Sequence, residues 1–307
     1  MISVVIPLYN KESFIAEAIQ SVLQQTFTQW ELLIVNDAST DNSVAFAKQS
    51  KDSRIRIIHI EKSGVSVARN VGIANASFSW IALLDADDWW DSTFLEEMAR
   101  GIKEYPNQQL FASGRTHVFP AFSKRYNNIF LPKEGHTAIV NYFEVLQSYL
   151  PLINSSNAVI ERSLFAEVGL FKEHQKLHED HDLWIRLCLG REVVFVNKNL
   201  SFYRNTEANS ASKLPYEAND FCIFLHTLLE QKGKFSNPER KYFKKYCNRF
   251  VLLTYIKNYA RYTTKEDNEV YLLAKKLVTP SHRLILKFLH WLPFKGTYPM
   301  FKVFQLK

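Results

Sequence analysis

Three aspartates crowd one short stretch, Leu83–Trp90, which reads Leu-Leu-Asp-Ala-Asp-Asp-Trp-Trp. The apolar residues before them predict a buried strand that runs directly into Asp85, Asp87 and Asp88. Several carboxylates are costly to bury together unless a cation lies beside them. Hard oxygen ligands suit Mg²⁺ or Mn²⁺, which take further ligands from water or from a substrate phosphate. We therefore expect a divalent metal that binds a diphosphate here.

The alternative is that these acids only cap the helix expected from Ser92 to Tyr105. An aspartate just before a helix accepts hydrogen bonds from its first N–H groups. Asp91 or Ser92 can do this unaided, so the acids further upstream need another explanation. Acid clusters of this kind are frequent at functional sites, which favours the metal–diphosphate interpretation.

Polar residues follow other predicted strands as well. Tyr9 comes after the strand Ile2–Pro7, and its ring could stack on a planar base or simply belong to a turn. Asp37 comes after the strand Glu31–Asn36. Because the Ser39–Asp41 segment can cap the next helix, Asp37 is left as an acceptor for a base N–H or a ribose hydroxyl.

Arg69 lies within a helix predicted to begin just after Gly64. An arginine on a helix often lays its stem on the surface and keeps its charge in water. Its planar guanidinium also matches a diphosphate with two parallel hydrogen bonds. Both interpretations of Arg69 stay open on the sequence alone.

Strands and helices alternate through the first 110 residues, which predicts a parallel sheet covered on both faces. Ligands of such sheets bind beyond the carboxyl ends of the strands, where all the polar residues above lie. The expected strands are Ile2–Pro7, Glu31–Asn36, Arg54–Ile60 and Trp80–Leu84, and the expected helices are Ser13–Gln25, one opening at Ser39–Asp41, Val65–Ala76 and Ser92–Tyr105.

The region from Leu110 to Arg204 is less regular, and the chain after Tyr216 is predicted to be helical. Glu207–Pro215 is polar and is expected to be a connector. Within Leu110–Arg204, we expect strands at Leu110–Ala112, Ala158–Ile160 and Val193–Val196, an extended piece at Leu200–Arg204, a loop at Phe122–Gly135 and helices at Ser163–Val168 and Leu183–Leu189.

Composition limits the class of protein. The chain has 307 residues and is 47% hydrophobic, enough for one large domain or two ordinary ones. Its three cysteines show no CxxC spacing, which argues against a zinc site or disulfide framework and suits a reducing compartment. The N-terminus is predicted to be a strand and not a signal peptide, and no apolar run reaches the ~18 residues of a membrane span.

The charge is unevenly placed along the chain. Residues 232–307 hold 17 Lys and Arg against 4 Asp and Glu, a balance of +13, which leaves −6 of the total +7 for residues 1–231. The stretch His282–Phe294 mixes Leu, Ile, Phe and Trp with Arg283 and Lys287, which suits a helix lying on an anionic membrane surface. A helical hairpin packed on its own domain or on a second subunit is the alternative, and no RNA-binding module is present.

Four segments together resemble the family 2 glycosyltransferases of the GT-A fold. They are Val-Val-Ile-Pro-Leu-Tyr-Asn, Val-Asn-Asp-Ala-Ser-Thr-Asp, the Gly…Ala-Arg-Asn-x-Gly segment and Leu-Asp-Ala-Asp-Asp. The resemblance covers residues 1–110 strongly and continues loosely to Arg204. It implies an α/β GT-A fold, with a mostly parallel sheet flanked by helices. Residues 1–110 would bind the nucleotide sugar, 111–206 the acceptor, and 207–307 would form a basic helical extension.

The resemblance also implies roles for single residues. Pro7, Tyr9 and Asp37 would hold the nucleoside of a UDP-sugar, and Arg69 the base or diphosphate. A divalent metal, Mn²⁺ or Mg²⁺, would bind Asp87, with Asp85 on the ribose or metal and Asp88 as a further contact. Asn36 departs from the family, which often has a second aspartate at that position.

A Glu-Asp pair ahead of a Leu-Trp-x-Arg helix matches a further family feature, at Glu179 and Asp180. It implies that Asp180 is the general base, which inverting transfer needs opposite the leaving diphosphate, and that Glu179 contacts the sugar. Asp182 is the expected helix cap. Arg115 could touch the donor sugar and Arg204 could close over the diphosphate, unless both are ordinary surface arginines.

The sequence therefore predicts an inverting hexosyl- or N-acetylhexosaminyltransferase of bacterial cell-envelope polysaccharide synthesis. Its acceptor would be a glycan or a lipid-linked sugar. The protein would lie in the cytoplasm or on the inner face of the cell membrane, and it could form a homo-oligomer. A silent nucleotide-sugar- or glycan-binding module is one alternative. A nucleotidyltransferase is another, but it would normally carry a Gly-rich basic loop after the first strand, which is absent at Pro7–Asn10.

Overall fold

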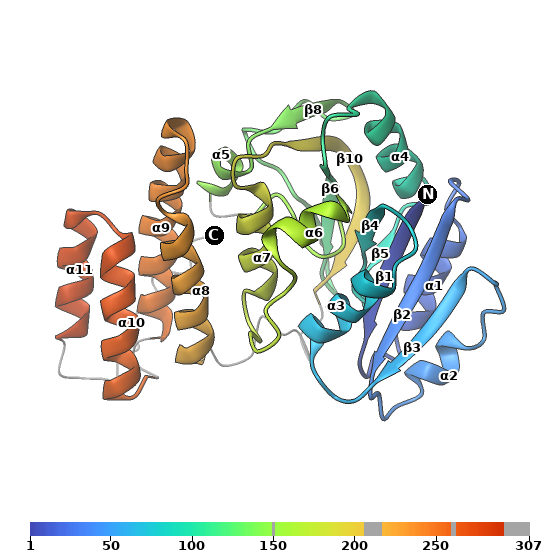
Figure 1. Ribbon diagram of the computed structural model, residues 1–307, viewed down its shortest axis with the longest axis horizontal. Coiled ribbons are helices and arrows are strands. Elements are labelled where there is room, and N and C mark those ends of the chain that lie inside the picture. The colour runs from blue at the N-terminus through green and yellow to red at the C-terminus, as the bar shows by residue number, and fades with distance from the viewer. Residues whose placement is uncertain (149–150, 206–216, 259–261, 292–307) are drawn as a thin grey trace. The chain divides into compact units, whose positions relative to one another are not determined.

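The computed structural model describes residues 1–148, 151–205, 217–258 and 262–291. The chain divides into two compact units, Met1–Leu214 and Pro215–Lys307. The first unit is an α/β domain built on one sheet, and the described part of the second is helical (Figure 1). The predicted division at residue 110 stays a prediction, and the predicted connector Glu207–Pro215 lies outside the described residues.

One mixed sheet organises the first unit, in the order β3-β2-β1-β4-β9-β6-β10-β5, with β7 paired to β6 and β8 to β10. The four strands from β3 to β4 are parallel, and β9 then runs antiparallel between β4 and β6. The strands are β1 (Ile2–Leu8), β2 (Trp30–Asp37), β3 (Ile55–Ile60), β4 (Trp80–Leu83), β5 (Trp89–Trp90), β6 (Leu110–Val118), β7 (Ser123–Arg125), β8 (Thr137–Val140), β9 (Ala158–Glu161) and β10 (Val193–Arg204).

Helices cover both faces of this sheet (Figure 1). All residues of β1 and β2 are buried, as expected for strands covered on both sides. Helices α1 and α4 join the core on one face, and α3 packs against β1 and β2. The helices are α1 (Ile15–Leu23), α2 (Ser43–Ala47), α3 (Val65–Asn75), α4 (Phe94–Glu104), α5 (Tyr142–Leu146), α6 (Ser163–Val168) and α7 (Glu179–Cys188).

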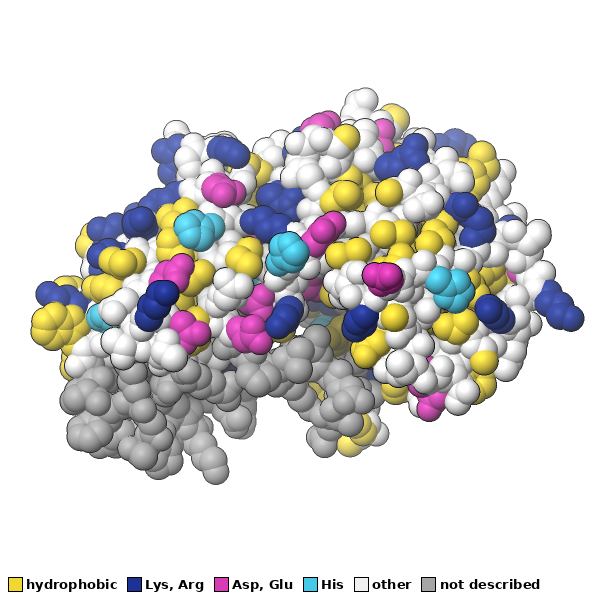
Figure 2. Space-filling model, turned by 60° about the horizontal axis from the view of Figure 1, so that its bottom comes forward, with side chains coloured by type: hydrophobic (Ala, Val, Ile, Leu, Met, Phe, Trp, Pro, Cys, Tyr) yellow, Lys and Arg dark blue, Asp and Glu magenta, His cyan; other side chains and the backbone are white. Residues whose placement is uncertain are grey.

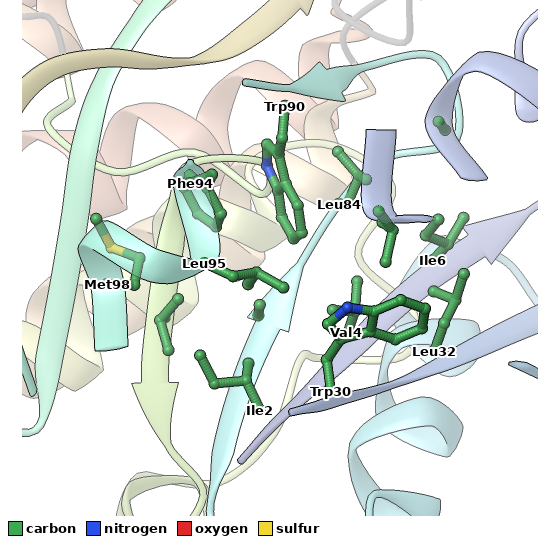
Figure 3. Packing of buried hydrophobic residues seen from close by; sticks show 14 of the residues in the cluster. Ile2, Val4, Ile6, Trp30, Leu32, Leu84, Trp90, Phe94, Leu95 and Met98 are labelled. Carbon is green, nitrogen blue, oxygen red and sulfur yellow. The ribbon is translucent and has the colours of Figure 1, made fainter. Parts of the chain in front are cut away.

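The core beneath α1 and α4 fixes the strands that carry the polar loops. Alternate residues of β1 point into it, among them Ile2, Val4 and Ile6 (Figure 3). The rings of Trp90 and Phe94 stack there with centroids 4.2 Å apart. Burial of each large apolar side chain stabilises the fold by roughly 1.5–3 kcal/mol. The ends of β1, β2 and β4 are therefore held on a rigid base.

Gly72 lets α3 approach the opposite face of the sheet. A Cβ at this position would lie only 2.2 Å from Cγ1 of Val5 in β1. No side chain fits into that space, so the helix can come this close only with glycine here. The close approach sets the position of Arg69, which lies one turn earlier in α3.

The predicted elements of the first 110 residues are present, whereas later ones differ. Strand β6 runs from Leu110 to Val118, well beyond the predicted Ala112, and β10 joins the two predicted pieces into one strand. Shifts in register at Asn199 keep β10 beside β6. Strand β8, helix α5 and the short β5 and β7 were not predicted, because these segments are too short for a clear period.

The described part of the second unit consists of α8 (Ala218–Gln231), α9 (Asn237–Asn258), α10 (Thr264–Leu277) and α11 (Pro280–His290). Thr263 and Glu266 form a reciprocal cap at the start of α10. Lys and Arg side chains are dense over the part of Figure 2 in which these helices lie. Among the described helices, none is long and apolar enough to cross a membrane.

Candidate active site

The carboxylate of Asp37 ends β2 and holds the loop before α3. Its Oδ1 accepts a hydrogen bond from the Ser63 N–H at 2.6 Å, and its Oδ2 accepts from the Gly64 N–H at 3.0 Å. The ammonium of Lys62 lies 2.6 Å from the same Oδ2. Gly64 has a φ of +95°, a conformation that side chains resist, so glycine suits the turn into α3. Asp37 is thus both an anchor for this loop and a buried charge.

Tyr9 follows β1 at the same edge of the sheet, and its side chain is exposed. The loops after β1 and β2 are joined because Asn10 Oδ1 accepts a hydrogen bond from the Thr40 N–H at 2.8 Å. Pro7 lies buried within β1, opposite Val35 of β2. The Lys62 ammonium lies 3.0 Å from the centroid of the Tyr9 ring, so Tyr9 and Asp37 share one cation.

Arg69 connects two acidic segments that are far apart in the sequence. Its Nη2 donates to Oδ1 of Asp85 at 2.7 Å, and its Nη1 donates to Oε1 of Glu179 at 3.0 Å. The side chain is 4% exposed, and its guanidinium also lies over the Phe171 ring. Burial alone would lower the pKa of Arg69, but the carboxylates of Asp85 and Glu179 outweigh it and raise that pKa. Arg69 therefore stays charged although buried.

The other two aspartates of the loop differ from each other. Asp87 accepts from the Lys11 ammonium at 2.5 Å and is partly exposed. Asp88 is buried, and its two oxygens accept from the Ser156 hydroxyl at 2.5 Å and the Arg204 N–H at 2.9 Å. Burial, with the charges of Asp85 and Asp87, raises the pKa of Asp88 well above its usual range. Asp87 thus pairs with a partly exposed lysine side chain, whereas Asp88 is held by a buried hydroxyl and a backbone N–H.

The Glu179–Asp180 pair begins α7, and Arg69 links Glu179 to Asp85 of the aspartate loop. Burial and the Asp180 charge raise the pKa of Glu179 to about 7, against the opposing effect of Arg69. Burial would raise the pKa of Asp180 too, but His181 and Arg69 outweigh it and lower that pKa. Two neighbouring acids with opposite shifts are the pattern expected of an acid–base site.

The predicted capping role of Asp182 is wrong. Helix α7 already begins at Glu179, after His178 in a left-handed conformation with a φ of +61°. Asp182 lies inside the first turn, fully buried, and accepts from Nε of Arg186 at 2.7 Å and from Lys172 at 3.0 Å. Sequence reasoning placed the helix start too late, because the first turn, Glu179–Asp182, consists of charged and polar residues and carries no apolar period.

Arg115 and Arg204 are both engaged with protein groups. Arg115 is buried, donates to the Leu152 and Pro151 carbonyl oxygens at 2.8 Å each, and lies over the Tyr126 ring. Arg204 donates through Nε to the Asp87 carbonyl oxygen at 3.0 Å and lies over the Trp89 ring. Arg115 therefore positions the segment before β9, and Arg204 borders the aspartate loop. Their contacts with a donor stay predictions.

Comparison with known protein families matches residues 3–169 to "Glycosyl transferase family 2", which is more than half of the chain. The chain belongs to this family. The match includes Asp37 at the end of β2, Arg69 in α3 and the aspartate loop after β4, and it stops before the Glu179–Asp180 pair.

Relatives of this family 2 chain come from several bacteria. It is 28% identical over 221 residues to "Glycosyltransferase GlyA" of Streptococcus pneumoniae, covering 66% of this chain but only 30% of GlyA. It is 29% identical over 216 residues to "UDP-Glc:alpha-D-GlcNAc-diphosphoundecaprenol beta-1,3-glucosyltransferase WfgD" of Escherichia coli, covering 69% of this chain and 80% of WfgD. The chain spans less than a third of the length of the first of these relatives.

Solved structures support the fold of this family 2 chain. The crystal structure of TarS from S. aureus in complex with UDP-GlcNAc aligns with a TM-score of 0.72, over 94% of this chain and 86% of that one. The identity is 19%, so the likeness concerns the fold. The predicted GT-A fold with C-terminal helices is confirmed.

The donor set of the aspartate loop fits a hard divalent cation. Asp85 and Asp87 offer partly exposed carboxylates, and the Lys11 ammonium on Asp87 marks a place where positive charge is stabilised. Asp88 has both oxygens engaged by Ser156 and Arg204. Within residues 1–148, 151–205 and the two described helical ranges, no three His, Cys, Asp or Glu side chains gather as a ready-made metal site. A metal here would take further ligands from water and phosphate.

Sequence reasoning missed Lys11, Lys62 and Ser156. The two lysines reach carboxylates 76 and 25 residues away in the chain. Ser156 supports the aspartate loop twice, since its hydroxyl also accepts from the Asp85 N–H at 3.1 Å. The only sequence signal was that Lys11 and Lys62 follow strands β1 and β3, whose carboxyl ends lie at the same edge of the sheet as those of β2 and β4.

Proposed function

We propose that this chain is an inverting glycosyltransferase that uses a nucleotide-diphosphate sugar, with UDP as the nucleotide. The observation that carries the proposal is the bridge from Asp85 through Arg69 to Glu179. It joins the acids at the end of β4 to the acid pair at the start of α7. A donor held at the first set would thus have its sugar near the second.

Tyr9 and Asp37 would bind the nucleoside, with Pro7 shaping the strand end between them. An exposed aromatic ring beside a buried carboxylate can stack on a base and accept its N–H. Arg69 would hold the diphosphate or the base edge. Mn²⁺ or Mg²⁺ held by Asp85 and Asp87 would neutralise charge on the leaving diphosphate. Arg115 and Arg204 would border the donor from the sugar and diphosphate sides.

Asp180 would act as the general base. Its lowered pKa keeps it ionised near neutral pH, so it can accept the proton of an acceptor hydroxyl as that oxygen attacks the anomeric carbon. The new glycosidic bond forms as the bond to the diphosphate breaks, and UDP leaves. Glu179, fixed by Arg69, would orient the sugar or acceptor. No covalent enzyme intermediate is needed.

The acceptor we propose is a glycan or a lipid-linked sugar of a bacterial surface polysaccharide. The name of WfgD specifies a UDP-Glc donor and a diphosphoundecaprenol-linked acceptor, and TarS was solved with UDP-GlcNAc. Both names support a UDP-linked hexose or N-acetylhexosamine as the donor.

A lipid-linked acceptor gives a reason for contact with a membrane surface, and we propose α11 for this contact. The helix buries Leu286 and Leu289 and exposes Leu284 and Phe288 by 71% and 67%, and Trp291, directly after its last residue, is 75% exposed. The spacing of the exposed side chains places them on one helix face. The second unit carries 17 Lys and Arg against 7 Asp and Glu, so an anionic bilayer fits its charge.

The test is release of UDP from a panel of UDP-sugars, with Mn²⁺ or Mg²⁺ present and then removed by a chelator. We expect one sugar to be turned over with metal, and Asp87→Ala to lose most of that turnover while it stays folded. Binding of UDP-sugars without turnover under every condition would instead indicate a silent binding module. Failure of every UDP-sugar, and of UDP, to raise the melting temperature would contradict the donor site itself.

A further inference from the structure

Lys62 takes up two interactions that a bound base would need. Its ammonium lies 2.6 Å from Oδ2 of Asp37 and 3.0 Å from the centroid of the Tyr9 ring. The side chain of Lys62 is 49% exposed, whereas that of Asp37 is 2% exposed. Lys62 thus covers a buried carboxylate and a solvent-facing ring from the water side.

The other donors to Asp37 are backbone groups that cannot leave. The Ser63 and Gly64 N–H groups belong to the turn that starts α3 and hold the carboxylate in place. Among the described residues, Lys62 is the only side chain that donates to Asp37. It is therefore the exchangeable partner of this carboxylate.

We propose that Lys62 is an internal competitor for the nucleobase, so that it sets the affinity of the nucleotide site. The inference rests on the proposed uridine-nucleotide site. A base stacked on Tyr9 with an N–H on Asp37 would take the same ring face and the same oxygen. The ammonium has to move away before such a base can bind.

Release of Lys62 is physically easy. An ion pair with a half-exposed lysine is weak, because water competes for the ammonium and the four-carbon stem is flexible. We call the protein covered when Lys62 contacts Asp37 and the Tyr9 ring, and open when it does not. The covered state is nonetheless favoured in the free protein, since the ammonium then pairs with the Asp37 carboxylate and lies on the Tyr9 ring. The apparent dissociation constant of a ligand equals its intrinsic value divided by the fraction of protein that is open. Lys62 therefore weakens base binding by a modest factor.

The test uses uridine, a neutral probe whose binding does not depend on phosphate charge. Lys62→Met keeps the length of the side chain and removes its charge. We expect the dissociation constant of uridine to fall about three- to tenfold, as it would if roughly 70–90% of the wild-type protein is covered. Lys62→Arg, which keeps the charge and can lie on the ring, should behave like wild type. Lys51→Met changes an exposed lysine before β3 and serves as the matched control.

Salt gives a second readout that a purely structural role would not produce. Salt screens a half-exposed ion pair, so uridine should bind wild type more tightly as NaCl rises. The affinity of Lys62→Met should change little over the same range. The two proteins should thus converge at high salt. Lys62→Gln supplies the same measurement should Lys62→Met fail to fold.

Two results would overturn the proposal in distinguishable ways. Equal or weaker uridine binding by folded Lys62→Met would mean that Lys62 is neutral or helps to bind the base, while the uridine site itself would stand. Absence of binding of uridine and of UDP to wild type and variant alike would contradict the proposed nucleotide site and the inference with it. Tighter binding with the expected salt dependence would support both.

Discussion

Positive charge is used differently in the two units of the chain. In the first unit, Asp37, Asp85 and Asp87 each have a cationic side chain from another segment within hydrogen-bond distance. That unit holds 21 Lys and Arg against 24 Asp and Glu, whereas the second holds 17 against 7. The first thus satisfies its charges internally, while the second carries an excess that an external anion could satisfy.

The comparison separates two kinds of binding surface. The carboxylates at the strand ends are held in place by the fold, so a ligand of Asp37 or Asp87 must take the place of one specific lysine side chain. The exposed face of α11 has no such geometry, and its binding depends on apolar area and net charge. Substitutions in the first unit should therefore change chemistry and stability, and those in α11 should change only membrane affinity.

The largest expected effect is that of Asp180→Asn. The amide cannot accept the acceptor proton, so we expect the rate of sugar transfer to fall about 10²–10⁴-fold. The melting temperature and the affinity for UDP should stay close to wild type. The measurement is steady-state transfer at saturating donor and acceptor.

Glu173→Gln is the control for Asp180→Asn, since it removes an exposed acid shortly before α7. Retention of most activity in Asp180→Asn, with its loss in Glu179→Gln, would move the role of base to Glu179. That outcome would fit the raised pKa of Glu179, about 7, better than the present assignment.

Arg69→Met should cause the largest loss of stability. It leaves Asp85 and the mostly buried Glu179 without their shared cation, and loss of one partner from a buried ion pair costs about 3–5 kcal/mol. We expect this decrease in the free energy of unfolding in urea. The double variant Arg69→Met/Glu179→Gln should recover part of it. Equal stability of the single variant and wild type would show that the bridge is not formed in solution.

These residues also mark what the sequence could predict. The first four parallel strands, and the loops with Asp37, Arg69 and Asp85, follow from apolar runs and from motif spacing. The bridge from Arg69 to Glu179 does not, because it joins residues 110 apart in the chain. The lysine partners of Asp37 and Asp87 could not be chosen either, since long flexible side chains carry no periodic signal. The start of α7 was missed because its first turn is made of polar residues.

The pH dependence of stability should report on Glu179. Its pKa is about 7 in the folded protein, against 4.5 for an unperturbed glutamate, so the folded state holds this proton more tightly. The resulting stabilisation is complete below pH 4.5 and is lost as the pH rises through 7. Between pH 5 and pH 8, wild type should lose on the order of 1–3 kcal/mol relative to Glu179→Gln. Parallel stability curves for the two proteins would contradict the raised pKa.

The smallest expected effect concerns α11, and it tests the other side of the comparison. Phe288→Ser/Trp291→Ser removes two exposed rings that the second unit does not need for packing. Binding to vesicles of phosphatidylglycerol and phosphatidylcholine should fall about tenfold, since each ring would bury apolar area in the bilayer surface. Release of UDP with a soluble acceptor should not change.

Leu272→Ser is the matched control for α11, because it removes an exposed apolar side chain from the neighbouring helix α10. Arg283→Gln/Lys287→Gln should weaken vesicle binding only at low salt, since charge acts over about a Debye length, whereas the loss of the two rings should persist at high salt. If Phe288→Ser/Trp291→Ser loses self-association while its vesicle binding is unchanged, this face of α11 is an interface between two copies of the chain. Equal binding of wild type to neutral and anionic vesicles would remove the role of charge in the second unit.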